Sequence, residues 1–172
     1  MGKGAFPGTD ELYTGMLGMH GTKTSALALE NCDLMIVFGS RFSDRVLCNA
    51  DTFAKGKKII HIEIDPAEIG KNIDAYLAVN GDLKYVISKM NHLLSKQNHS
   101  EWINQVSEWK SEYPLLMKAS ESDDEVLPSD VVSALDNLTD GKAIITTEVG
   151  QHQMWAAQFY NCLLYTSHAA DE

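Results

Sequence analysis

The stretch NCDLMIVFGSRFSDR, residues 31–45, joins an unbroken apolar run to a glycine and two arginines. An apolar run of this length, rich in β-branched and aromatic residues, predicts a strand that is buried on both faces. Such strands are typical of parallel α/β sheets, in which ligands bind beyond the carboxyl ends of the strands. Because Gly39, Arg41, Asp44 and Arg45 follow the run, we predict a site for an anion at this strand end.

Length, charge and cysteine content exclude several classes of protein. The chain has 172 residues, of which 44% are hydrophobic, so it holds one domain or one domain with part of another. Its net charge of −10 disfavours nucleic acid as a partner, and an anionic ligand must therefore be bound by local groups. Cys32, Cys48 and Cys162 lack the spacing of a metal site or a disulfide framework and predict reduced thiols. Since no apolar run approaches the roughly 18 residues that span a bilayer, we expect a soluble protein from a reducing compartment, with no membrane partner.

Hydrophobic periodicity predicts part of a doubly wound α/β unit in the first half of the chain. Residues 1–20 are rich in glycine and predict a loop packed against other structure. A short helix over 22–30 leads into the apolar strand. Further strands are expected over 57–66, where isoleucines alternate with polar residues, and over 75–79. Asp82 begins an amphipathic helix that runs to about residue 96.

The second half predicts a helix over 101–113, an exposed acidic linker over 118–125 that marks a domain boundary, and then a new αβα pattern. Pro128 opens a helix, residues 143–147 form a buried strand, and residues 153–160 form the next helix. The turn between that strand and helix again contains glycine, and free amides at a helix start attract anions.

The residues at the two strand ends have functional and purely structural interpretations. Arg41 and Arg45 are able to bind phosphate oxygens through bidentate hydrogen bonds, and Asp44 is able to hold one arginine in place. The alternative is that the three residues form a surface salt-bridge cluster. Glu63 fits an acceptor for ribose or adenine groups, or else a helix cap or loop anchor. The chain has no GxGxxG fingerprint, so the sequence does not predict a Rossmann dinucleotide site.

The histidines also divide into candidates and packing residues. His20 fits a cofactor contact or a cap for the helix that follows it. His152 fits a hydrogen bond to a diphosphate or a role in proton transfer, or a helix-start histidine with no task. His61 is expected to pack inside the sheet, and His92 and His99 to face solvent. No spacing predicts a metal site or a Ser/His/Asp or Cys/His nucleophile.

Four blocks of sequence resemble one family, in its order and at its spacing. They are LGMHGT (17–22), GSRFSDR (39–45), HIEIDPAEIGKN (61–72) and TTEVGQHQMWAAQ (146–158), and they resemble the large catalytic subunit of acetolactate synthase (acetohydroxyacid synthase), a thiamine diphosphate enzyme. The resemblance covers residues 1–160. The QHQMWAAQ block is highly specific within thiamine diphosphate enzymes, whereas the HIEID block is less so.

The resemblance implies a domain organisation for an internal fragment. Residues 1–96 are similar to the second half of the family's central FAD-binding domain, a doubly wound parallel sheet. Residues 97–126 would be a helical connection and acidic linker. Residues 127–160 are similar to the start of the thiamine diphosphate-binding α/β domain, and 161–172 would be a tail foreign to the family.

The resemblance also implies an activity. The family condenses two pyruvates, or pyruvate and 2-oxobutyrate, with loss of CO2, to 2-acetolactate or 2-aceto-2-hydroxybutyrate in branched-chain amino acid biosynthesis. Its cofactors are thiamine diphosphate, Mg²⁺ and an FAD that does no net redox work. The resemblance also implies a homo-oligomer that assembles with a small regulatory subunit. It implies a location in the cytoplasm, or in a plastid or mitochondrion if the source is a eukaryote.

Carried over by position, the resemblance implies cofactor contacts but no metal ligand in this chain. The implied flavin contacts are Leu17, Gly18, Met19, His20, Gly39, Ser40, Arg41, Arg45, Glu63, Ile64 and Asp82. The implied thiamine diphosphate contacts are Val149, Gly150, Gln151 and His152.

Three departures from the family pattern bear on function. Ser43 and Glu63 stand where the family commonly has aspartate, and the pattern stops at Asn161. The family's cofactor-activating glutamate and its Gly-Asp-Gly…Asn metal motif have no counterpart here, so we expect the chain alone to be inactive. The alternatives are another thiamine diphosphate decarboxylase or oxidase, which the sequence of residues 151–155 disfavours, and a non-catalytic nucleotide-binding or subunit-interaction module.

Overall fold

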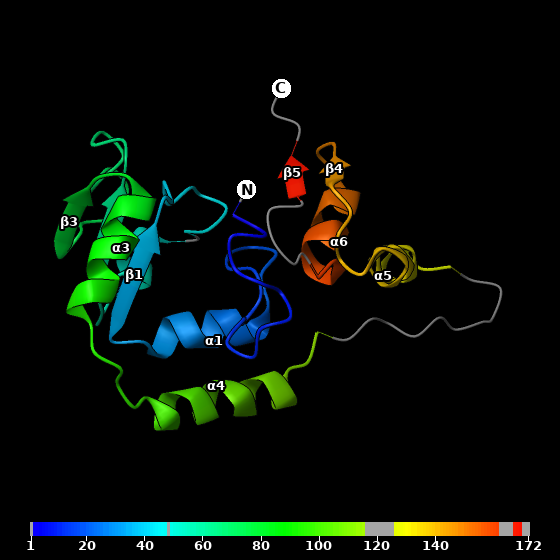
Figure 1. Ribbon diagram of the computed structural model, residues 1–172, viewed down its shortest axis with the longest axis horizontal. Helices are drawn as coiled ribbons and strands as arrows, with labels where there is room; N and C mark the ends of the chain where they lie inside the picture. The colour runs from blue at the N-terminus through cyan, green and yellow to red at the C-terminus, as the bar shows by residue number, and fades with distance from the viewer. Residues whose placement is uncertain (1, 48, 116–125, 162–166, 170–172) are drawn as a thin grey trace. The chain divides into compact units, whose positions relative to one another are not determined.

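The computed structural model describes residues 2–47, 49–115, 126–161 and 167–169 (Figure 1). The elements in chain order are α1 (Lys23–Asn31), β1 (Leu34–Phe38), α2 (Ala50–Phe53), β2 (Lys58–Glu63), β3 (Leu77–Asn80), α3 (Leu83–Leu93), α4 (Ser100–Glu112), α5 (Pro128–Thr139), β4 (Ile145–Thr147), α6 (Gln151–Phe159) and β5 (Ser167–Ala169). They form two compact units. The sheet unit comprises Leu17–Met19 and Ala26–Gln105, and the terminal unit comprises Met1–Met16, His20–Ser25 and Val106–Glu172.

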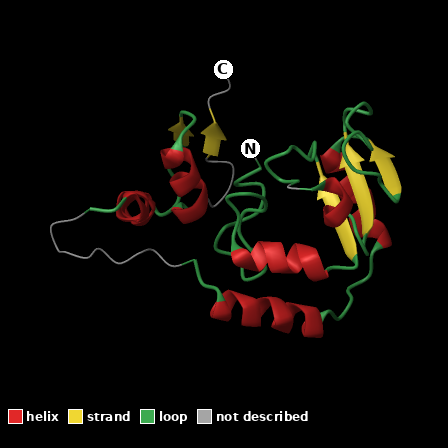
Figure 2. Ribbon diagram, turned by 180° about the vertical axis from the view of Figure 1, so that it is seen from behind, coloured by secondary structure: helices red, strands yellow, loops and turns green. Residues whose placement is uncertain are grey.

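The sheet unit is built on three parallel strands in the order β1-β2-β3. Leu34 pairs with Lys58 at the start of β1, and Phe38 pairs with Ile62 at its end. On the other side of β2, Glu63 pairs with Asn80. Helix α3 lies against one face of these strands, as the opposed views in Figures 1 and 2 agree. The α/β class and the parallel sheet predicted from the sequence are confirmed.

The apolar core of the sheet unit lies between β1, β2 and the loops that follow them. Its buried members are Phe42, Leu47, Phe53, Ile59 and Ile73. The rings of Phe42 and Phe53 meet edge to face, with their centroids 5.8 Å apart. This geometry adds to the free energy that burial of the two rings contributes.

The prediction that β1 is buried on both faces is wrong. Met35 and Val37 pack against the core, but Leu34, Ile36 and Phe38 are 44%, 37% and 43% exposed. The strand lies at one edge of the sheet, and the described residues leave one of its faces uncovered. An apolar run reports how hydrophobic a strand is, but not how many layers cover it.

The predicted strand over 57–66 is confirmed as β2, but its burial does not alternate. Ile59, His61, Ile62 and Glu63 are all buried, because β2 is the central strand and both of its faces are covered. His61 has no exposed surface, which confirms its assignment to packing. Ile64 lies beyond the strand end and is 65% exposed.

Local capping residues set two of the helix starts in this unit. Asp82 caps α3 by accepting a hydrogen bond from the Tyr85 amide at 3.0 Å, as its position before the helix predicts. Asn49 caps α2 in the same way through the Thr52 amide. The predicted strand over 75–79 is observed as β3, which begins two residues later and ends one residue later.

In the terminal unit, the buried Tyr160 joins the end of α6 to the segment between α5 and β4. The Tyr160 hydroxyl accepts from the Ala143 amide at 3.0 Å and donates to the Ala143 carbonyl at 3.2 Å. Pro128 lies in the first turn of α5, as predicted, and the helix ends at Thr139, followed by Asp140 and Gly141 in the left-handed region. These residues fix where the chain turns into β4.

The prediction of a buried strand over 143–147 is wrong in its burial. The strand is β4, and Ile144 just before it is 70% exposed. Within the described residues β4 pairs only with β5, so little of the chain covers it. The acidic linker predicted over 118–125 lies outside the described residues.

Cys32 is a half-buried thiol at the end of α1. Burial raises the pKa of the Cys32 thiol above its usual range, although nearby Lys57 opposes the shift. A thiol in this environment is a weak nucleophile at neutral pH. Among the described helices, none has the length and apolar character that crossing a bilayer requires.

The two isoleucines that flank Glu63 should differ sharply in their contribution to stability. We expect Ile62→Ala to lower the free energy of unfolding by about 2–5 kcal/mol, because it opens a cavity in the core. The control Ile64→Ala should change it by less than about 0.5 kcal/mol. Urea denaturation followed by circular dichroism measures both values, and equal losses would contradict the burial described for β2.

Candidate functional site

The carboxyl ends of the three parallel strands meet at one edge of the sheet. The Gly39 amide donates to the Ile62 carbonyl at 2.9 Å, and the Gly81 amide donates to the Glu63 carbonyl at 3.1 Å. These bonds join the turn after each outer strand to the end of β2. The sheet order therefore brings the predicted residues Gly39, Glu63 and Asp82 to the same edge.

The arginine loop, residues 40–45, follows β1 at this edge. The side chains of Arg41 and Arg45 are exposed, and neither guanidinium is paired with any residue that the structure describes. The recorded ion pairs between described residues, Lys71–Glu68 and Lys142–Asp140, include neither arginine. The predicted alternative, a surface salt-bridge cluster, is therefore not formed. Two free guanidinium groups at a strand end are suited to forked binding of phosphate oxygens.

Asp44 acts on the arginine loop differently from the prediction. Its carboxylate accepts a hydrogen bond from the backbone amide of Arg45 at 3.0 Å. It therefore orders the main chain at residue 45 and leaves the guanidinium free. The prediction that Asp44 holds an arginine side chain is wrong.

Gly18 allows a second segment to approach the arginine loop closely. The Met19 amide donates to the Arg45 carbonyl at 2.9 Å. Gly18 has a φ of +102°, and a Cβ built on it would lie 2.5 Å from the Arg45 carbonyl oxygen and 3.0 Å from the Val46 Cα. Only glycine fits this approach, which brings Leu17, Gly18 and Met19 beside Arg45.

Glu63 and Asp82 both have structural tasks. The Glu63 carboxylate is buried and accepts from the amides of Ile64 at 2.9 Å and Asp65 at 3.4 Å, so it anchors the turn after β2. Asp82 caps α3. The loop-anchor alternative for Glu63 is thus the one that the structure supports, while flavin contacts by Glu63, Ile64 and Asp82 stay predictions.

Two polar residues that sequence reasoning did not connect with the site contact the backbone of the arginine loop. The His61 Nε2 lies 2.9 Å from the Ser40 carbonyl oxygen. The Asn72 amide group donates to the carbonyls of Arg41 at 2.9 Å and Phe42 at 3.2 Å. A histidine between isoleucines in a buried strand was the available signal for His61, whereas nothing local marks Asn72.

His20 belongs to the terminal unit, and its carbonyl accepts a hydrogen bond from the Gln158 side chain at 3.0 Å. The residue that caps α1 is Thr22, whose hydroxyl accepts from the Ser25 amide at 3.0 Å. The alternative that His20 caps this helix is therefore wrong. A contact between His20 and a flavin stays a prediction.

The second predicted site lies around the start of α6. This helix begins at Gln151, two residues earlier than the sequence predicted. Gly150 precedes the helix without a side-chain cap, and Val149, Gln151 and His152 are exposed. A Cβ on Gly150 would lie 2.8 Å from Cε1 of His152, because the imidazole folds back over the glycine. The four predicted residues thus lie at a helix N-terminus, where the amides of Gln151 and His152 have no carbonyl one turn earlier in the helix, while the Gln153 amide donates to the Gly150 carbonyl at 3.2 Å.

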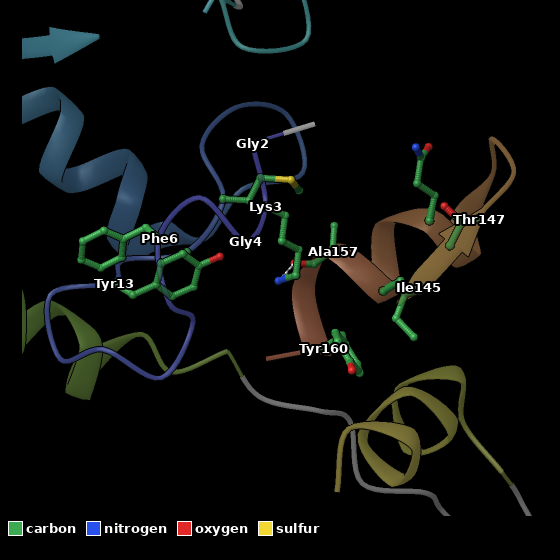
Figure 3. Close-up of a pocket in the computed structure, with 13 residues that line it drawn as sticks. Gly2, Lys3, Gly4, Phe6, Tyr13, Ile145, Thr147, Ala157 and Tyr160 are labelled. Carbon is green, nitrogen blue, oxygen red and sulfur yellow. Dashed lines mark hydrogen bonds between the residues drawn. The ribbon is translucent and has the colours of Figure 1, made fainter. Parts of the chain in front are cut away.

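A cavity of about 270 Å³ in the terminal unit adjoins this second site (Figure 3). Lys3 points across it and donates to the Ala157 carbonyl at 2.7 Å, while Phe6 and Tyr13 stack with their centroids 6.5 Å apart. Thr147 and Gln153 line it, but none of Val149, Gly150, Gln151 and His152 does. Among the described residues, no group of three or more His, Cys, Asp or Glu side chains is arranged to bind a metal ion.

Replacing Gly18 should lower the free energy of unfolding more than replacing a glycine that also has a positive φ but has open space around it. An alanine in the left-handed region costs about 1–2 kcal/mol. We expect Gly18→Ala to lower the free energy of unfolding by more than this, because the added Cβ also collides with the Arg45 backbone. Gly56→Ala is the control, since Gly56 has a φ of +78° and no atom within 4 Å of the added Cβ. Thermal denaturation compares the two, and a loss no greater in Gly18→Ala would argue against the close approach.

Comparison with known proteins identifies the family. The profile described as "Thiamine pyrophosphate enzyme, central domain" matches residues 1–90. The chain is 47% identical to a chloroplastic acetolactate synthase of Arabidopsis thaliana over 94% of its own length, and 47% identical to an acetolactate synthase large subunit of Parasynechococcus marenigrum over 92%. It is 45% identical to the chloroplastic acetolactate synthase 1 of Oryza sativa subsp. japonica over 93%.

These relatives are much longer than the chain. It spans 25% of the Arabidopsis protein and 26% of each of the other two. The parallel sheet and these matches agree, and the chain therefore belongs to the thiamine pyrophosphate enzyme family and is a homologue of the acetolactate synthase large subunit.

Proposed function

We propose that this chain forms part of an acetolactate synthase catalytic subunit. The proposed reaction condenses two pyruvates, or pyruvate and 2-oxobutyrate, with decarboxylation, at the entry to branched-chain amino acid biosynthesis. The observation that carries the proposal is the pair of exposed guanidinium groups at the carboxyl edge of the sheet, Arg41 and Arg45, which form no ion pair with a described residue. The similarity to acetolactate synthases, at 47% identity over more than nine-tenths of the chain, supports it.

The arginine loop is the proposed FAD contact. A flavin dinucleotide carries a diphosphate, which suits two guanidinium groups that make no ion pair with a described residue. The close approach at Gly18 fits such a ligand, because the backbone of residues 17–19 lies beside Arg45 with no side chain at position 18. The net charge of −10 does not favour an anion, so affinity must come from these local groups.

The start of α6 is the proposed thiamine diphosphate contact, through Val149, Gly150, Gln151 and His152. Free amides at a helix N-terminus favour a diphosphate, and the exposed imidazole of His152 is able to donate to one of its oxygens. Bound thiamine diphosphate supplies the carbanion-stabilising chemistry of the condensation. The proposed Mg²⁺ would hold its diphosphate through ligands that we do not assign to this chain.

The finer organisation is part of the same proposal. Residues 1–96 would be part of a doubly wound central domain, 97–126 a connection, 127–160 the start of the thiamine diphosphate domain, and 161–172 a tail foreign to the family. The proposed assembly is a homo-oligomer with a small regulatory subunit, which the printed name "large subunit" of one relative supports. The chloroplastic relatives support a plastid location if the source is a plant.

Binding of FAD to the full chain tests the first site. We expect Arg41→Gln and Arg45→Gln each to weaken FAD binding by about tenfold or more, because each removes charge-assisted hydrogen bonds to the diphosphate. Lys96→Gln removes the same charge from an exposed position after α3 and should leave the affinity unchanged. Fluorescence titration of FAD measures the dissociation constants, and an equal effect of all three changes would remove the arginine loop from the site.

The chain by itself should not turn over substrate. The family's activating glutamate and metal motif have no counterpart in these residues, so we expect no acetolactate from pyruvate with thiamine diphosphate, Mg²⁺ and FAD present. A longer acetolactate synthase is the positive control in the same assay. Acetolactate above the no-protein background would show that the chain contains a complete centre after all.

A further inference from the structure

The backbone of the arginine loop bends in a way that bulky residues seldom adopt. Phe42 has a φ of +49°, in the left-handed region, yet its ring is buried in the core of the sheet unit. The ring packs edge-on against His61, with centroids 5.0 Å apart and an interplanar angle of 75°. A conformation of this kind is maintained only where surrounding contacts over-determine it.

Side chains from outside the loop bind three consecutive carbonyl oxygens at this bend. His61 on β2 contacts the carbonyl of Ser40, and Asn72 donates to the carbonyls of Arg41 and Phe42. His61 lies 21 residues from the loop in sequence, and Asn72 about 30. The bend is thus determined by the folded sheet unit, because the loop's own sequence provides neither donor.

The contact with Ser40 also fixes the tautomer of His61. A carbonyl oxygen only accepts hydrogen bonds, so the Nε2 atom of His61 carries the hydrogen and donates it. The Nδ1 atom is then an acceptor, and it is buried with no hydrogen-bond partner in the described structure. A buried acceptor without a hydrogen bond lowers the stability of the fold. The buried position of the His61 imidazole therefore carries a cost in stability.

We infer that His61 and Asn72 are positioning residues for the flavin site: together they form a backbone clamp on residues 40–42. The clamp turns Phe42 into the core and its neighbour Arg41 outward, so that the guanidinium stands at the sheet edge. What the loop binds rests on the proposed function. The clamp itself rests only on the hydrogen bonds and packing described above.

Limited proteolysis with trypsin tests the clamp without any ligand, because trypsin cleaves after Arg41 and Arg45 on the loop itself. Asn72→Asp removes both donors at nearly constant shape. We expect it to speed cleavage of the Arg41–Phe42 bond by about tenfold relative to the unchanged chain. The change is local, so cleavage at lysines of the terminal unit should keep its rate.

Asn80→Asp is the matched control. The Asn80 amide group also donates to two carbonyls at this sheet edge, those of Glu63 at 3.0 Å and Ile64 at 2.9 Å, but it does not touch the arginine loop. Both asparagines are exposed. Equal acceleration after Arg41 in both variants would overturn the clamp, since it would reflect general loosening of the sheet edge.

Substitutions of His61 give a second, independent readout. His61→Gln keeps an N–H donor near the Nε2 position and should retain slow cleavage after Arg41, whereas His61→Leu should accelerate it. Rescue by glutamine separates the hydrogen bond from mere filling of the core. Fast cleavage in both His61 variants, together with no effect of Asn72→Asp, would overturn the inference.

FAD titration of the same proteins separates the clamp from the proposed ligand. We expect Asn72→Asp to weaken FAD binding several-fold and Asn80→Asp to leave it unchanged. If the unchanged chain binds no FAD but the cleavage pattern is as expected, the flavin assignment fails and the clamp stands. If FAD binds and Asn72→Asp alters neither its affinity nor the cleavage after Arg41, the clamp fails and the flavin assignment stands.

Discussion

Parallel pairing of β1, β2 and β3 is the constraint on which the candidate flavin site depends. Parallel strands all end at the same edge, and their connections must cross back before the next strand begins. The turn after β1, the anchor at Glu63 and the turn before α3 therefore meet, although they are far apart in sequence. A change of register by one residue would turn the side chains of the shifted strand to the opposite face of the sheet.

Much of this edge was predictable, because its signals are local. The strands followed from apolar runs, and the cap at Asp82 followed from its place before a periodic helix. The place of Arg41 and Arg45 at the strand end followed from the glycine that ends the apolar run. Residues whose role depends on distant partners were not. Nothing near Asn72 in sequence indicates that it binds the carbonyls of residues 41 and 42, and the direction of the Glu63 carboxylate depends on the turn that it anchors.

Burial was the property that the sequence predicted least well. The apolar character of residues 34–38 and 143–147 indicated strands correctly, yet one face of β1 and the residue before β4 are exposed. The alternation along β2 suggested two different faces, but a central strand is covered on both. Composition sets how much free energy burial would release, whereas the neighbours of a strand decide whether that burial happens.

The division of the chain into two units has a consequence for the order of folding. The terminal unit takes residues from both ends of the chain, while most of the sheet unit is one continuous stretch, Ala26–Gln105. Contacts within that stretch close short loops, but joining residues 1–16 to residues beyond 106 closes a loop of most of the chain, at a larger entropic cost. On a ribosome, the sheet and its arginine loop are therefore able to form while the partners of the N-terminal segment are still unsynthesised.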